Sequence, residues 1–76
     1  MNKVLDILKD IRPEFDFSDG RGYVDEGMLD SFDIITLVSE LDSVFNISID
    51  GLDILPENFN SLNSIMTLVR NNGGNI

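Results

Sequence analysis

The chain has 76 residues, with fourteen acidic and five basic side chains and a formal net charge of −9, and it contains no cysteine and no histidine. The absence of both residue types excludes disulfides, thiolate metal sites and catalysis by Ser-His or Cys-His pairs. With 42% hydrophobic residues the chain should still fold, and we expect one small domain, not an enzyme, spanning residues 1–76.

Apolar residues near the N-terminus recur at the spacing of one helical face. They are Val4, Leu5, Ile7, Leu8 and Ile11. Asn2 is placed to cap this helix, and Pro13 ends it because proline lacks the backbone N–H that a helix interior needs. The pattern predicts an amphipathic helix that packs on the core.

Residues 14–30 break the helical pattern and predict a long loop punctuated by Gly20, Gly22 and Gly27. A loop of this length is unusual in so small a domain and is often functional. Its apolar side chains are expected to attach it to the core. They are Phe15, Phe17, Tyr23, Val24, Met28 and Leu29.

Ser31 is predicted to open a second helix that ends near Phe45, with Asn46 as a left-handed residue after it. At about 100° per residue, one broad apolar stripe predicts its buried face. The stripe contains Ile34, Leu37, Val38, Leu41, Val44 and Phe45. Phe32 and Ile35 fall outside it, so either the loop or a short helix covers them or they form an exposed docking patch.

A short helix is predicted over residues 56–59, with Pro56 at its first position. Asn60 or Ser61 then caps a last helix, which the glycines at 73–74 end. The apolar stripe of this last helix is Leu62, Ile65, Met66, Leu68 and Val69. The predicted fold class is therefore all-α: a small four-helix bundle with three longer helices and one short one.

Acidic residues dominate the middle of the chain. Residues 14–57 hold twelve acids and one base, Arg21. Such a field repels nucleic acid and anionic lipid and attracts basic protein surfaces, although general solubility also explains a charge run. The sequence has neither the apolar stretch of a signal peptide nor the roughly 20 apolar residues of a membrane span. We expect a cytoplasmic monomer without membrane insertion.

Asp30-Ser31-Phe32-Asp33 begins the predicted second helix. Serine and aspartate are common N-caps, so these residues have an ordinary structural explanation. A serine at a helix N-terminus is also exposed, and the positive end of the helix favours a phosphate there. No histidine, cysteine or lysine adjoins Ser31, so another protein must supply the base and metal for any chemistry on its hydroxyl. The pattern indicates a modification site and not a catalytic nucleophile.

Residues 27–38, Gly-Met-Leu-Asp-Ser-Phe-Asp-Ile-Ile-Thr-Leu-Val, resemble the phosphopantetheine attachment region of acyl and peptidyl carrier proteins. Residues 55–61, Leu-Pro-Glu-Asn-Phe-Asn-Ser, are similar to the end of such domains, and the resemblance covers nearly the whole chain. It implies that a phosphopantetheinyl transferase attaches a 4'-phosphopantetheine arm from coenzyme A to Ser31, beside Asp30. The arm would hold an acyl or aminoacyl group as a thioester.

The same resemblance implies a surface around Ser31 that binds partner enzymes. These would be the transferase, a loading ligase and downstream acyl-transfer enzymes with basic surfaces, in fatty-acid, polyketide, peptide or cell-envelope biosynthesis. The implied contact residues are Met28, Asp30, Phe32, Asp33, Ile35, Glu40 and Asp42. Charge reversal at Asp30 or Asp33 is expected to slow arm attachment with little loss of fold.

Two features leave the class of cargo and of function open. Ser39 departs from many fatty-acid carriers, which have an apolar residue there. The Gly-Met-Leu-Asp-Ser form of residues 27–31 looks closer to free-standing carriers loaded by adenylate-forming ligases, including D-alanyl and peptide-synthetase carriers. The loop resembles an EF-hand, but starting from Asp16 the required glycine is Arg21 and the required glutamate is Gly27. We expect no such metal site; weak calcium binding and an unmodified acidic interaction module stay as alternatives.

Overall fold

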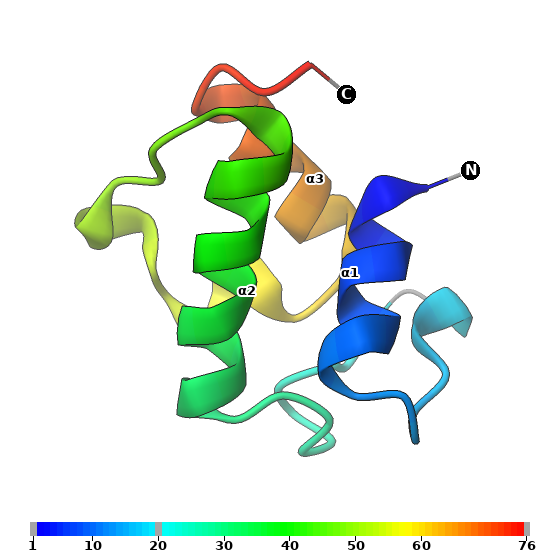
Figure 1. Ribbon diagram of the computed structural model, residues 1–76. Helices are drawn as coiled ribbons and strands as arrows, with labels where there is room; N and C mark the ends of the chain where they lie inside the picture. The colour runs from blue at the N-terminus through cyan, green and yellow to red at the C-terminus, as the bar shows by residue number, and fades with distance from the viewer. Residues whose placement is uncertain (1, 20, 76) are drawn as a thin grey trace.

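In a computed structural model that describes residues 2–19 and 21–75, the chain is all-α (Figure 1). Its α-helices are α1 (Lys3–Ile11), α2 (Ser31–Phe45) and α3 (Leu62–Asn71). Short 3-10 helices lie between them: η1 (Phe17–Asp19), η2 (Gly51–Asp53) and η3 (Pro56–Phe59). No strand forms in the described residues, although one isolated bridge pairs Arg21 with Ser61. No helix among them is long and apolar enough to cross a bilayer.

The first helix has the ends that the sequence predicts. The Asn2 side chain accepts hydrogen bonds from the N–H groups of Val4, at 2.9 Å, and Leu5, at 3.2 Å. The helix ends at Ile11, two residues before Pro13. Because α1 and α2 run in opposite directions, the end of α1 and the start of α2 lie at the same end of the molecule (Figure 1).

The later helix boundaries also agree with the sequence. Asn46 adopts the left-handed conformation after α2, with φ of 54°. The short helix predicted over residues 56–59 is present as η3, a 3-10 helix with Pro56 in its first turn. Ser61, one of the two predicted caps, accepts the Ser64 N–H at 3.0 Å and starts α3.

One core joins the three α-helices and the long loop. Its buried side chains are Val4, Ile7, Leu8, Phe17, Tyr23, Leu29, Ile34, Leu37, Leu41, Ile49, Phe59, Ile65, Leu68 and Val69. The rings of Phe17 and Tyr23 meet edge to face at 4.9 Å, and the Tyr23 hydroxyl donates to the Phe17 carbonyl at 2.6 Å. The prediction that aromatic residues attach the loop to the core is therefore confirmed. Gly20, which was predicted to punctuate the loop, lies outside the described residues.

Asn60 fastens the second half of the loop to the segment before α3. Its backbone carbonyl accepts the Tyr23 N–H at 3.0 Å. Its side-chain oxygen accepts the N–H groups of Val24 and Asp25 at 2.9 and 3.1 Å. Asn60 was one of two candidate caps for the last helix, and the structure uses it to hold the loop instead.

The buried face of α2 matches the predicted stripe except at one residue. Ile34, Leu37 and Leu41 are buried, and the half-buried Val38 and Phe45 pack against the core. Val44 is 42% exposed, so its predicted place in the core is wrong. It lies at the margin of the stripe in the last turn of α2, where little of the core reaches it.

Candidate modification site

Asp30 and Asp33 cap the start of α2 reciprocally. The Asp30 side chain accepts the Asp33 N–H at 2.9 Å, and the Asp33 side chain accepts the Asp30 N–H at 3.1 Å. This capping box satisfies backbone donors that a helix start otherwise leaves unpaired. It fixes the backbone on both sides of Ser31, the first residue of the helix.

Ser31 is exposed at this helix start. Because Asp30 provides the cap, the serine side chain is not used for it. In the part of the chain that the structure describes, the Ser31 hydroxyl makes no hydrogen bond. The hydroxyl therefore lies in solvent on a fixed backbone, close to N–H groups whose partial positive charge favours an attached phosphate.

Arg12 connects the end of α1 to the capping box. Its Nε donates to Asp33 Oδ2 at 2.8 Å, its Nη2 to Asp30 Oδ2 at 3.2 Å, and its Nη1 to Glu14 Oε2 at 3.2 Å. The Asp33 side chain is 13% exposed and the Arg12 side chain 32%. A single guanidinium therefore binds both carboxylates that flank Ser31.

The charges of this network reinforce one another. The backbone N–H of Asp33 lowers the pKa of Asp30 below its ordinary value of 3.8, and the positive charge of Arg12 lowers it further, while partial burial opposes both. The hydrogen bond to Asp33, followed by the one to Glu14, raises the pKa of Arg12 above its ordinary value. At neutral pH both Asp30 and Arg12 are therefore charged.

The network changes one expectation from the sequence. Charge reversal at Asp30 or Asp33 was expected to leave the fold nearly intact. Both carboxylates accept a backbone N–H of the helix start and bind Arg12, so a positive side chain at either position loses these bonds and repels the guanidinium. We therefore expect reversal to destabilise the start of α2 in addition to any effect on partners.

Phe32 and Ile35 form an exposed apolar pair next to Ser31. Their exposed fractions are 81% and 63%, so neither the loop nor η3 covers them. Of the two explanations that the sequence left open, the structure favours uncovered side chains. A large aromatic side chain in water beside a free hydroxyl is the feature expected of a surface that a second protein contacts.

The other three residues implied in partner binding differ in their surroundings. Glu40 is exposed on α2. Met28 is half-buried and packs against the core. Asp42 is half-buried, and its Oδ1 accepts the Ile49 N–H at 3.0 Å, so its carboxylate holds the segment after α2.

Two acids of the long loop accept hydrogen bonds, one from within the loop and one from the segment before α3. The Asp16 side chain accepts the Ser18 N–H at 3.0 Å, and Asp25 accepts the Asn60 side-chain amide at 3.0 Å. Across residues 2–19 and 21–75, no three acidic side chains come together as a group that could hold a metal ion.

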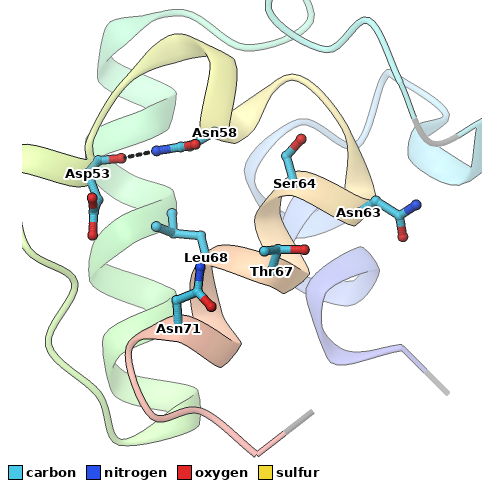
Figure 2. Close-up of a pocket in the computed structure, with 7 residues that line it drawn as sticks. All are labelled: Asp53, Asn58, Asn63, Ser64, Thr67, Leu68 and Asn71. Carbon is cyan, nitrogen blue, oxygen red and sulfur yellow. Dashed lines mark hydrogen bonds between the residues drawn. The ribbon is translucent and has the colours of Figure 1, made fainter.

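An open surface pocket of about 390 Å³ lies between η2, η3 and α3 (Figure 2). It is lined by Asp53, Asn58, Asn63, Ser64, Thr67, Leu68 and Asn71. The Asn58 amide donates to the Asp53 carbonyl at 2.7 Å, which helps to shape its rim. None of the residues implied around Ser31 lines it, so this hollow and the candidate modification site are separate features of the surface.

Arg12 is the member of the site that the sequence did not reveal. It precedes Pro13 at the end of α1, and its partners Asp30 and Asp33 lie 18 and 21 positions away. An arginine in a predominantly acidic chain was a visible signal, but sequence spacing does not say which carboxylates a helix end will meet. Comparison of the chain with protein-family models, curated proteins and solved structures found no match in any of the three.

Proposed function

We propose that the protein is an acyl carrier protein, which carries an acyl or aminoacyl group on a 4'-phosphopantetheine arm attached to Ser31. The observation that carries this proposal is the Ser31 hydroxyl: exposed, at the first position of a capped 15-residue helix, and without a hydrogen-bond partner in the described residues. A side chain of this kind suits modification by another enzyme. The resemblance of residues 27–38 to carrier attachment regions agrees with it.

The arrangement of helices supports the same proposal. α1, α2 and α3 together with the short η3 give three longer helices and one short one, in the order of the carrier bundle that the sequence resembles. The long loop before α2 is packed on the core through Phe17 and Tyr23, which gives Ser31 a rigid support. The proposed protein is a monomeric cytoplasmic carrier and not an enzyme.

Attachment of the arm needs a partner because no histidine, cysteine or lysine adjoins Ser31, and the carboxylates of Asp30 and Asp33 are held by the capping box and by Arg12. Ser31 Oγ would form a bond to the β-phosphorus of coenzyme A while the pyrophosphate bond to the adenosine bisphosphate leaving group breaks. The hydroxyl proton passes to a base of the transferase. The N–H groups at the start of α2 favour the resulting phosphodiester. Once attached, the arm supplies a thiol that holds the cargo as a thioester.

Partner enzymes would bind the surface around the attachment point. Phe32 and Ile35 offer an exposed apolar centre, and Glu40 adds negative charge further along α2. This combination suits enzymes with a basic rim and an apolar contact. The Gly-Met-Leu-Asp-Ser form of residues 27–31 is the sequence feature that favours cargo loaded by an adenylate-forming ligase, such as a D-alanyl group, and the serine at position 39 departs from fatty-acid carriers.

Intact-mass measurement tests the attachment. The purified protein is incubated with coenzyme A, Mg²⁺ and a broad-specificity phosphopantetheinyl transferase, and the mass should increase by one arm. Ser31→Ala should show no increase. Ser39→Ala, which removes another exposed serine of α2, is the matched control and should be modified like the parent. An unmodified parent would favour the alternative of an acidic interaction module that docks through Phe32 and Ile35 without an arm.

A further inference from the structure

Arg12 holds an unusual position among the charged residues. The three salt bridges formed within residues 2–19 and 21–75 all belong to its guanidinium. Two of them reach the carboxylates of Asp30 and Asp33, which lie on either side of Ser31 in the sequence. Every other basic residue in the described chain lacks such a bridge. The geometry thus concentrates the ionic contacts of the protein at one helix start.

The contacts of Arg12 act on the capping box itself. Asp33 Oδ2 accepts both the Arg12 Nε, at 2.8 Å, and the backbone N–H of Asp30, at 3.1 Å. Asp30 accepts the Asp33 N–H through Oδ1 and binds Arg12 Nη2 through Oδ2. Arg12 therefore holds each carboxylate in the orientation in which it caps the helix.

The arginine itself is fixed by α1. Its backbone N–H donates to the Leu8 carbonyl at 2.9 Å, and Pro13 restricts the chain directly after it. The guanidinium thus ties the end of α1 to the start of α2 across a loop that has few helical residues of its own. A planar, forked group suits this task, since it binds several carboxylate oxygens in a defined geometry.

We propose that Arg12 is a positioning residue for the modification of Ser31. Through Asp33 and Asp30 it fixes the backbone of the helix start, and so it fixes the direction in which the Ser31 hydroxyl meets the transferase. This inference rests on the proposed function, since it concerns the same hydroxyl. It differs from a role in stability alone, because it predicts a loss in the rate of attachment from a variant that is still folded.

Replacing Arg12 changes both the net charge of the protein and the alignment of the Ser31 hydroxyl. These two changes should affect the kinetics of arm attachment in opposite directions, which makes the proposal testable. Replacing Arg12 by glutamine makes an acidic carrier one charge more negative, and this alone should strengthen binding to a basic transferase and lower KM. Loss of the hydroxyl's alignment should instead lower kcat, because misplaced reacting groups reach the transition state less often. A split between kcat and KM therefore separates the two effects.

The experiment compares Arg12→Gln and Arg12→Lys with the parent and with Arg70→Gln. Arg70 is exposed in the last turn of α3, so its replacement removes the same charge away from Ser31. Attachment rates are measured by intact mass with coenzyme A, Mg²⁺ and the transferase, at a temperature where circular dichroism shows each variant folded. We expect kcat to fall about tenfold in Arg12→Gln and less in Arg12→Lys, with KM unchanged or lower. Arg70→Gln should keep the parent kcat.

A second readout follows the helix start without the transferase. In Arg12→Gln, amide hydrogen exchange should become faster at Asp30 and Asp33 while the buried amides of α2 keep their protection. If Arg12→Gln does not fold, the attachment kinetics and the amide hydrogen exchange of Arg12→Lys test the proposal instead.

Two results would overturn the proposal. One is an Arg12 variant with parent kcat; the other is a loss of protection spread evenly over the molecule, which indicates stability alone. A parent protein that accepts no arm would instead reject the proposed function, so the two failures are distinguishable.

Discussion

At the scale of single residues, the side chains that cap α2 are different from the side chain that presents a hydroxyl to solvent at its start. Asp30 and Asp33 provide the hydrogen bonds that cap the helix, and Arg12 holds both of them. The Ser31 hydroxyl is left in solvent. Because the cap does not depend on Ser31, a change at its oxygen leaves the hydrogen bonds of the helix start in place.

The lowered pKa of Asp30 predicts a dependence of stability on pH. A carboxyl whose folded pKa lies below its ordinary value stabilises the fold fully above that value, and this contribution is lost as pH falls through the folded pKa. For Asp30 the ordinary value is 3.8, so the free energy of unfolding should decrease below about pH 4. Urea denaturation at about pH 6 and about pH 3 measures the loss. Asp30→Asn keeps a capping side chain that does not titrate, so the free energy of unfolding of this variant should decrease less between the two pH values. An equal decrease in the variant and the parent would contradict the assignment of the pH dependence to Asp30.

At the scale of elements, α2 has two apolar surfaces with different roles. Ile34, Leu37 and Leu41 are buried in the core, whereas Phe32 and Ile35 face solvent. The buried surface holds the helix on the domain. The exposed one leaves apolar area uncovered beside Ser31, which a contact with a partner enzyme would bury.

Two phenylalanines of matched size test this division. Phe32 is 81% exposed and Phe59 is fully buried. Phe59→Ala should lower the free energy of unfolding by about 3 to 5 kcal/mol, while Phe32→Ala should change it by less than about 0.5 kcal/mol. Thermal and urea denaturation measure both. Phe32→Ala should nevertheless lower kcat/KM for arm attachment several-fold, and a stability loss like that of Phe59→Ala would show that Phe32 belongs to the core.

The elements also show what the sequence could and could not predict. Helix ends were predictable because their signals are local: Asn2 before α1, Asn46 after α2 and Ser61 before α3. The contacts of Arg12 with Asp30 and Asp33 were not predictable, because they depend on how the loop between α1 and α2 places the two helices. Val44 was wrongly predicted to be buried for a related reason: an apolar stripe on a helix does not show how far the core extends along that helix.

At the scale of the whole molecule, negative charge is poorly compensated. The segment from residue 22 to residue 69 contains nine acids and no base. Salt bridges in the described residues are confined to Arg12, so most of these carboxylates have no cation beside them. Repulsion among them should therefore oppose the compact state.

Ionic strength should consequently stabilise the protein. Raising NaCl from about 0.02 M to about 0.5 M shortens the screening length several-fold and weakens repulsion between exposed carboxylates. We expect the melting temperature to rise by about 5 °C, since about 1 kcal/mol shifts the midpoint of a domain of this size by that much. KCl at the same concentrations is the control for ion identity. A melting temperature that stays constant or falls with salt would show that the repulsion is unimportant.

The most direct test of the proposed carrier function is to locate the arm after enzymatic attachment. The modified protein is fragmented in a mass spectrometer, and the fragment ions show which residue carries the added group. We expect the arm on Ser31 and on no other serine, including Ser18, Ser39 and Ser61. An arm found on another residue, or no arm with any competent transferase, would contradict the proposal.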